Sequence, residues 1–343
     1  MAFRTIALAG LAAVALGAPL TGASAQGTVV LYCGVQEEWC RAMSSAFERE
    51  TGIKVAMTRK SSGEIYAQVK AESANPKGDI WWGGTGDPHQ QAAEEGLTEE
   101  YKSANMPQLQ DWALRQWEQT KGRTIGIYSG ALGFGYNAKL LKAKGLPEPK
   151  CWADLIDPKF KDEVQVADPN SSGTSYTMLA SIIQIFGEDK GFDYMKALHK
   201  NVNQYTKSGA APAKAVSLGE SVIGITFMHD MIAAGADNPD VKTVAPCEGT
   251  GYEIGSMSLI KGARNPDNAK KFYDWALTPV PQSLGAQNKQ FQVPSNKSTP
   301  LPPLGLDLTK INLIKYDFAK YGSSAERTRL LGKWDKEVKS LPK

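Results

Sequence analysis

Short apolar runs alternate with amphipathic stretches along the first third of the chain. The runs with the length and composition of buried strands are Thr28–Tyr32, Lys54–Thr58 and Asp79–Trp82. Stretches with apolar residues at helical spacing follow them, over Glu37–Thr51, Ser62–Ala74 and Pro88–Glu95. This β-α-β-α-β-α order predicts a parallel sheet with helices on both faces, and in such sheets ligands bind beyond the carboxyl ends of the strands.

Two long extended runs divide this pattern into two αβ series. Thr124–Tyr136 and Gly251–Ile260 are apolar and rich in glycine, and they suit strands that cross between domains. The elements expected between them are a strand over Val164–Ala167, a helix from near Ser172, a helix over Ala211–Gly219, a strand over Ser221–Phe227 and a helix from Met231. Asn265-Pro266-Asp267 is expected to cap a further helix that ends at Leu277.

Two crossings between two αβ series predict two lobes with a hinge and a cleft. We expect lobe 1 to comprise residues 26–130 plus 255–300, and lobe 2 to comprise residues 131–254. The C-terminal segment, residues 301–343, is expected to pack on either lobe.

The N-terminal 25 residues have the features of a signal peptide. Arg4 supplies a charged start, Thr5–Leu20 is largely apolar, and Ala23-Ser24-Ala25 offers small residues at a cleavage site. The apolar stretch is too short and too broken by Gly and Pro to suit a membrane span. No cysteine stands at the cleavage site, which disfavours a lipid anchor. We therefore expect export, with cleavage after Ala25.

Composition narrows the class of protein. A chain of 343 residues suits two domains, and a net charge of +3 is too small to indicate nucleic-acid binding. The four cysteines are Cys33, Cys40, Cys151 and Cys247. An even number in an exported protein favours disulfides, with three possible pairings. We prefer Cys33–Cys40 with Cys151–Cys247, because the first pair is local and leaves the other two. The alternative, a metal site, lacks C-x-x-C spacing and a nearby histidine.

Several motifs, taken in order, resemble those of one protein family. They are Leu31–Gly34, Gly133–Asn137, Trp152–Phe160, Ala167–Thr174, Leu259–Ala263 and Asn265-Pro266. In these the chain resembles family-1 extracellular solute-binding proteins over nearly the whole mature sequence. The resemblance implies an α/β type II periplasmic binding fold, with two lobes joined by two crossing strands around a ligand cleft. It also implies a periplasmic monomer that delivers a small anionic ligand to an ABC permease, without catalytic residues or a cofactor.

The same resemblance bears on the ligand. Ferric-binding relatives carry two adjacent tyrosines after the strand that corresponds to Ser221–Phe227, and this pair is absent here. Hexose-phosphate-binding relatives place a His-Asp pair there and a Glu further on, which matches His229, Asp230 and Glu253. Carboxylates accept paired hydrogen bonds from vicinal hydroxyls, and histidine donates or accepts. The plainer interpretation of His229-Asp230 is an aspartate helix cap beside a hydrogen-bonded histidine.

Hydroxyl-rich segments at two expected helix starts predict an anion site. Ser61–Glu64 and Ser171–Ser175 place hydroxyls and free backbone N–H groups where the helix dipole favours anions. Helix capping explains Ser61 with Glu64, but it does not explain the hydroxyls of Ser171–Ser175. The expected anion-binding residues are Ser61, Ser62, Thr85, Ser172, Gly173, Thr174, Ser175 and Ser208. Lys207 is a lone lysine of the kind usually solvated, and Trp81, Trp82, Tyr128 and Tyr252 are candidates either for sugar stacking or for the core.

A sugar phosphate suits both halves of this predicted site, and a phosphonate or another organophosphate suits the anion half equally well. Ferric iron is a weaker alternative. An enzyme such as a secreted hydrolase is disfavoured, since the chain has three histidines and no G-x-S-x-G, H-E-x-x-H or Walker motif. An adhesin or structural protein would not need two lobes with anion-ready loops. We expect ligand capture by lobe closure, without metal or chemistry.

Overall fold

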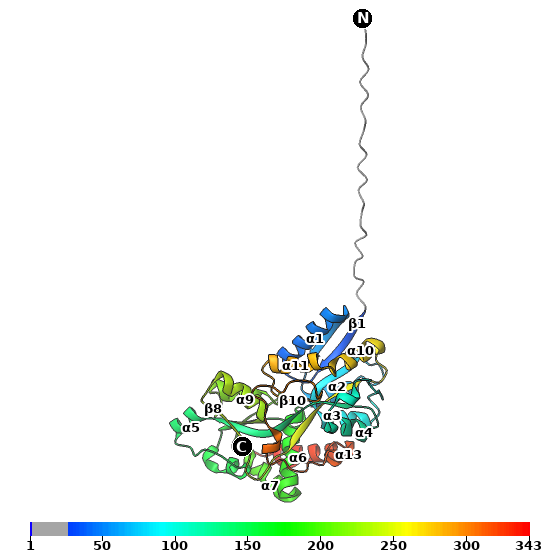
Figure 1. The fold of residues 1–343 in the computed structure, drawn as a ribbon. Coiled ribbons are helices and arrows are strands. Elements are labelled where there is room, and N and C mark those ends of the chain that lie inside the picture. Colours follow the sequence, from blue (N-terminus) through cyan, green and yellow to red (C-terminus); the bar gives the residue numbers. More distant parts are fainter. Residues whose placement is uncertain (2–26) are drawn as a thin grey trace.

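The computed structural model describes Met1 and residues 27–343 (Figure 1). The expected signal peptide and its cleavage site after Ala25 lie outside the described residues. The helices are α1 (Glu37–Thr51), α2 (Ser62–Ala71), α3 (Gly86–Glu94), α4 (Asp111–Gln119), α5 (Ala138–Lys144), α6 (Gly173–Phe186), α7 (Glu188–His199), α8 (Ala211–Leu218), α9 (Met228–Asp237), α10 (Pro266–Ala276), α11 (Pro279–Gln287), α12 (Phe318–Tyr321) and α13 (Ser324–Trp334).

The strands form one continuous sheet through both lobes. They are β1 (Thr28–Cys33), β2 (Lys54–Arg59), β3 (Ile80–Thr85), β4 (Ile125–Asn137), β5 (Val164–Ala167), β6 (Val202–Thr206), β7 (Ile223–Phe227), β8 (Val241–Val244), β9 (Tyr252–Leu259) and β10 (Val293–Pro294). The order along the sheet is β2-β1-β3-β9-β4-β7-β5-β6, with β8 and β10 paired to β4. As predicted, β1 pairs in parallel with β2 and β3. In lobe 2, β5 pairs in parallel with β7 and with β6, a strand that the sequence analysis did not identify.

The two long extended runs are the crossing strands β4 and β9, which pair antiparallel with each other. On β4, Ile125 and Tyr128 belong to the core around α1 and α10, whereas Leu132 and Phe134 belong to the core around α6 and α7. Each lobe thus has its own core, and both cores include side chains of these strands. This architecture confirms the predicted fold class. The residue bounds given for the lobes remain a prediction.

Helices cover both faces of each half of the sheet. In lobe 1, α1 and α10 cover one face around Phe47 and Phe272, and α2 and α3 cover the other around Trp81. The larger core of lobe 2 surrounds Trp152 and Tyr176, and α8 and α9 form a smaller cluster on the opposite face. Because β1, β2 and β3 of lobe 1 run parallel, as do β5, β6 and β7 of lobe 2, the helices that follow these strands begin at one edge of the sheet.

The C-terminal segment joins the core of lobe 2 and also contacts lobe 1. Its side chains in that core are Tyr316, Phe318, Tyr321, Leu330, Trp334 and Val338. Helix α13 lies beside α3 (Figure 1), and Arg327 donates to Gln91 of α3 at 2.7 Å.

The structure contains elements that the sequence analysis did not predict, among them α4, α5, α7, β6 and β8. Two predicted details also differ. Helix α9 begins at Met228 rather than Met231, so His229 and Asp230 stand in its first turn. Asn265 precedes α10 without capping it through its side chain, which donates to Asp79 at 2.9 Å instead. Both disulfides, Cys33–Cys40 and Cys151–Cys247, are present as predicted.

Candidate functional site

A pocket lies between the lobes, with about 400 Å³ of space outside protein atoms, part of which is open to solvent. Its lining comes from both lobes and from the crossing strands. The residues are Gly34, Val35, Gln36, Arg59, Ser61, Ser62, Gly84, Thr85, Tyr128, Ser172, Gly173, Thr174, Ser208, Gly209, Ala210, Phe227, His229, Asp230, Glu253 and Gln292.

Helix N-termini from both lobes converge on this pocket. The residues that immediately precede α1, α2, α3, α6, α8 and α9 all line it, and they are Gln36, Ser61, Thr85, Ser172, Ala210 and Phe227. Such N-termini carry partial positive charge and backbone N–H groups without helical partners. The convergence follows from the parallel strands, which deliver successive helices to the same edge. The pocket is therefore suited to an anion.

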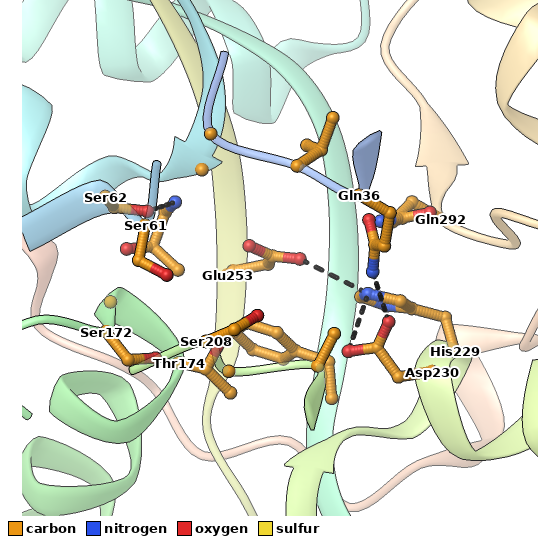
Figure 2. Close-up of a pocket in the computed structure, with 18 of the residues that line it drawn as sticks. Gln36, Ser61, Ser62, Ser172, Thr174, Ser208, His229, Asp230, Glu253 and Gln292 are labelled. Carbon is orange, nitrogen blue, oxygen red and sulfur yellow. Dashed lines mark hydrogen bonds and ion pairs between the residues drawn. The ribbon is translucent and has the colours of Figure 1, made fainter. Parts of the chain in front are cut away.

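One half of the pocket is rich in hydroxyls. Figure 2 shows Ser61 and Ser62 of lobe 1 opposite Ser172, Thr174 and Ser208 of lobe 2. Their sequence-predicted neighbours Thr85 and Gly173 line the same region.

Local hydrogen bonds fix part of this hydroxyl half. Ser62 Oγ accepts from the Thr85 N–H at 3.2 Å, and Ser172 Oγ accepts from the Ser175 N–H at 3.4 Å. Thr85 Oγ1 is buried without a partner among the described residues. Burying such a hydroxyl is costly unless it finds a hydrogen bond, so Thr85 Oγ1 is a ready group for a bound ligand.

Arg59 supplies a positive charge to this half, and the sequence analysis did not identify it. It ends β2, at the same sheet edge as the helix N-termini. Its Nε donates to the Val35 carbonyl at 2.8 Å, and its Nη2 donates to Ser208 Oγ of lobe 2 at 3.2 Å. Among the described residues that line the pocket, Arg59 is the one lysine or arginine.

His229, Asp230 and Glu253 form the other half of the pocket (Figure 2). His229 Nε2 lies 3.9 Å from Asp230 Oδ2 and 3.8 Å from Glu253 Oε1, distances longer than hydrogen bonds. Its ring stacks on Phe227 with centroids 5.4 Å apart. Asp230 Oδ2 accepts from Thr226 Oγ1 at 2.9 Å, which orients that carboxylate.

Burial alters the protonation of this group. It lowers the pKa of His229, although the charge of Asp230 opposes that change, so the imidazole is neutral at neutral pH. Burial, with the charges of Asp230 and Asp87, raises the pKa of Glu253 well above its usual range. A neutral imidazole both donates and accepts hydrogen bonds, and the raised pKa of Glu253 favours its protonated form, which does the same. This half is suited to ligand hydroxyls.

Direct contacts between the lobes show that the pocket is closed. Gln36 Nε2 donates to Asp230 Oδ1 across it, and the Gly63 N–H donates to the Ser171 carbonyl at 3.0 Å. A Cβ added at Gly173 would overlap Thr85 Oγ1 of the other lobe. This approach requires glycine at position 173.

The structure brings all but one of the sequence-predicted ligand residues to the pocket; Ser175 is outside the lining. Lys207 is exposed and also outside it. Of the aromatic candidates, Tyr128 lines the pocket and accepts from the Gly84 N–H at 2.8 Å, whereas Trp81, Trp82 and Tyr252 pack in the cores.

Three polar lining residues were missed by the sequence analysis, namely Gln36, Arg59 and Gln292. Gln36 follows the carboxyl end of β1 and Arg59 is the last residue of β2, and a position at the carboxyl end of a strand was an available signal. Gln292 stands in a loop near β10, where no local pattern points to the cleft.

Known proteins share this architecture. The structure of the periplasmic binding protein AfuA from Actinobacillus pleuropneumoniae, with fructose-6-phosphate bound, is 45% identical, with a TM-score of 0.89 over 92% of this chain and 100% of that one. The periplasmic binding protein P5PA is 39% identical, with a TM-score of 0.88 over 91% of this chain and 100% of its own. A Salmonella typhimurium periplasmic protein named for 2-aminoethylphosphonate binding is 27% identical over 71% of each chain.

Residues 75–320 match the family described as bacterial extracellular solute-binding protein. Among the described helices, none has both the length and the apolar character that crossing a membrane requires. Members of this family bind small solutes in the periplasm, deliver them to ABC importers and are not enzymes. With its two-lobed α/β fold and a polar pocket closed between the lobes, this chain belongs to the bacterial extracellular solute-binding proteins.

Proposed function

We propose that the protein captures a small phosphorylated organic anion, best fitted by a sugar phosphate, and presents it to an ABC importer. The observation that carries this proposal is the division of the pocket. The N-termini of α2 and α6, the hydroxyls and Arg59, which contacts Ser208, gather in one half. His229 and two carboxyl groups occupy the other half. A ligand with a phosphate at one end and hydroxyls at the other would satisfy both halves.

The anion half supplies three kinds of donor to a phosphate. The starts of α2 and α6 line this half and bring the partial positive charge of their helix dipoles to it. The hydroxyls of Ser61, Ser172 and Thr174 add neutral donors, and Arg59 adds charge-assisted ones. Phosphate presents several acceptor oxygens, which lets it use donors from both lobes at once.

The opposite half suits the hydroxyl end of the same ligand. Asp230 and Glu253 accept from vicinal hydroxyls, and His229 can donate or accept. The fructose-6-phosphate bound to AfuA, a protein 45% identical to this one, supports this assignment.

Capture then follows from lobe closure. Ligand contacts from both lobes favour the closed state, which the permease recognises. Tight binding of the closed form is sufficient, and no bond in the ligand changes.

The test is a thermal-shift screen of refolded, ligand-stripped protein, followed by calorimetric titration of each hit. The ligands are fructose 6-phosphate, fructose, inorganic phosphate, 2-aminoethylphosphonate and ferric citrate. A ligand that binds only the folded state raises the melting temperature by mass action. We expect the largest rise with fructose 6-phosphate. A rise with none of these ligands would overturn the proposal.

Variants at the hydroxyl end test the division of labour. His229→Ala and Glu253→Ala each remove hydrogen bonds to the sugar, so we expect affinity for fructose 6-phosphate to fall about tenfold or more. Affinity for inorganic phosphate should change much less, because it occupies only the anion half. Equal losses for both ligands would contradict the two-ended site.

A phosphonate is the second candidate ligand. The anion half suits it equally well, and the Salmonella typhimurium relative is named for 2-aminoethylphosphonate binding. A melting-temperature rise with 2-aminoethylphosphonate alone would favour it. Iron is less well supported, because position 227–231 carries Phe-Met-His-Asp-Met in place of a tyrosine pair.

A further inference from the structure

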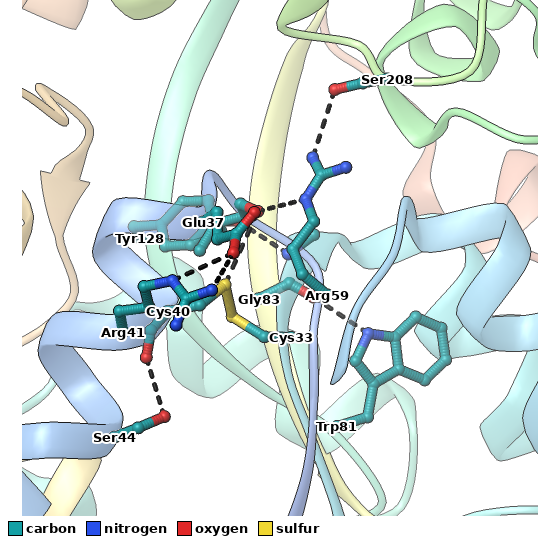
Figure 3. Close-up of a disulfide and its surroundings, with 12 residues drawn as sticks. Cys33, Glu37, Cys40, Arg41, Ser44, Arg59, Trp81, Gly83, Tyr128 and Ser208 are labelled. Atoms are coloured by element: carbon teal, nitrogen blue, oxygen red, sulfur yellow. Dashed lines mark hydrogen bonds and ion pairs between the residues drawn. A yellow bond between two sulfur atoms is a disulfide. The ribbon is translucent and has the colours of Figure 1, made fainter. Parts of the chain in front are cut away.

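A disulfide encloses one of the pocket-forming loops. Cys33 ends β1, and Cys40 lies in the first turns of α1. Between them, Gly34, Val35 and Gln36 all line the pocket. Both cysteines are fully buried. Figure 3 shows the disulfide beside Arg59 and Tyr128, two further lining residues.

The enclosed loop carries lobe 1 groups that reach across the pocket. Gln36 itself donates to Asp230 of lobe 2. The Val35 carbonyl accepts from Arg59 Nε at 2.8 Å, and the same guanidinium donates to Ser208 of lobe 2 at 3.2 Å (Figure 3). The position of the loop therefore sets both of these side-chain contacts between the lobes.

Backbone packing leaves the loop little room. The Gly34 N–H donates to the Trp82 carbonyl at 2.9 Å, and the Cys40 N–H donates to the Gln36 carbonyl at 3.1 Å. A Cβ added at Gly34 would overlap the Gly83 carbonyl of the neighbouring loop. The loop is thus anchored at both ends by the disulfide and packed in its middle against Gly83.

We propose that the Cys33–Cys40 disulfide acts as a positioning element for ligand binding. It holds Val35 in contact with Arg59 and Gln36 in contact with Asp230. Because the loop is already ordered before the ligand binds, ligand binding does not have to supply the entropy cost of ordering it. This inference rests on the proposed function of the pocket.

The second disulfide provides a matched control. Cys151 and Cys247 do not line the pocket, and they are 96 residues apart in sequence, compared with 7 for the first pair. In the chain-entropy account, the longer closed loop contributes more to global stability. Removing the first disulfide should therefore mainly lower the affinity for the ligand, whereas removing the second should mainly lower the stability of the protein.

The experiment compares Cys33→Ala/Cys40→Ala with Cys151→Ala/Cys247→Ala. Each is titrated calorimetrically with fructose 6-phosphate, or with whichever ligand of the panel binds the unmodified protein, and melted in parallel. We expect the first double variant to bind about tenfold more weakly. The second should lose melting temperature but keep its affinity.

Gly34→Ala tests the same loop with both disulfides intact, in case the first double variant does not fold. It displaces the loop from Gly83 and should also weaken binding about tenfold. Unchanged affinity in Gly34→Ala, or equal losses of affinity in the two double variants, would overturn the inference while leaving the proposed function in place. If the unmodified protein binds no ligand of the panel, the proposed function fails and this inference fails with it.

Discussion

Replacing Arg59 by methionine removes the positive side chain of the anion half while keeping much of the side-chain volume. Arg59 is held by hydrogen bonds to Val35 and Ser208, so its guanidinium is already placed in the closed pocket. A guanidinium carries five N–H groups. These two bonds therefore leave it capacity to donate to a phosphate.

The expected loss follows from the type of bond removed. A hydrogen bond that involves a charged group contributes about 1.5–3 kcal/mol, and each 1.4 kcal/mol is a factor of ten in affinity. We expect Arg59→Met to weaken binding of fructose 6-phosphate by about 10- to 100-fold. The affinity of Arg59→Lys should lie between those of Arg59→Met and the unmodified protein, because lysine keeps the charge but lacks the planar guanidinium group.

Calorimetric titration at low and high salt measures this loss. The salt dependence of binding should diminish in Arg59→Met, since salt screens the charge that has been removed. Lys207→Met is the matched control, because Lys207 is exposed and lies outside the pocket. The affinity of this variant for fructose 6-phosphate should equal that of the unmodified protein. Arg59→Met with unchanged affinity, or the same loss in Lys207→Met, would refute the role assigned to Arg59.

Two further predictions concern closure and pH. Gly173→Ala places a Cβ against Thr85 Oγ1 and should weaken ligand binding at least about tenfold in titrations, whereas Gly332→Ala, in open space on α13, should not. Burial raises the pKa of Asp87 from 3.8 to about 6, so the folded state holds this proton more tightly than the unfolded state does. The stability that results is fully present below pH 3.8 and is lost as the pH rises through about 6. In urea unfolding, the free energy of unfolding of Asp87→Asn should fall by about 3 kcal/mol less than that of the unmodified protein between these two pH values. The same pH profile in both proteins would contradict this prediction.

The periodicity of the sequence predicted the lobes because their helices and strands are stabilised by their own apolar faces. The crossing strands were recognisable for the same reason, as β4 is buried along its whole length. The sequence analysis did not assign the C-terminal segment, residues 301–343, to one lobe. Its α12 is short and α13 buries only Arg327, Leu330 and Trp334, so the place of the segment depends on contacts from Tyr316 and Trp334 to distant residues.

The site was predictable only in part, and Ser175 shows why. A run of hydroxyls looks uniform in sequence, but a helix turns each successive side chain by about 100°. Ser172 precedes α6 and faces the pocket, whereas Ser175 lies inside the first turn and gives its N–H to Ser172. Gln36 and Arg59 were missed for the opposite reason. Each is an ordinary polar residue locally, and only the approach of lobe 2 gives it a role.

The pocket places two carboxyl groups in a site proposed for an anion, and the charge distribution resolves this conflict. The raised pKa of Glu253 reduces the negative charge of its half near neutral pH, and Asp230 accepts from Gln36 and Thr226. Arg59 and the N-termini of α2 and α6 concentrate positive potential in the other half. A ligand with one anionic end and one neutral, hydroxyl-bearing end fits this polarity in a single orientation. A ligand with anions at both ends would bring its second charge against Asp230, so the proposed site favours an anionic group at one end of the ligand and a neutral, hydroxyl-bearing group at the other.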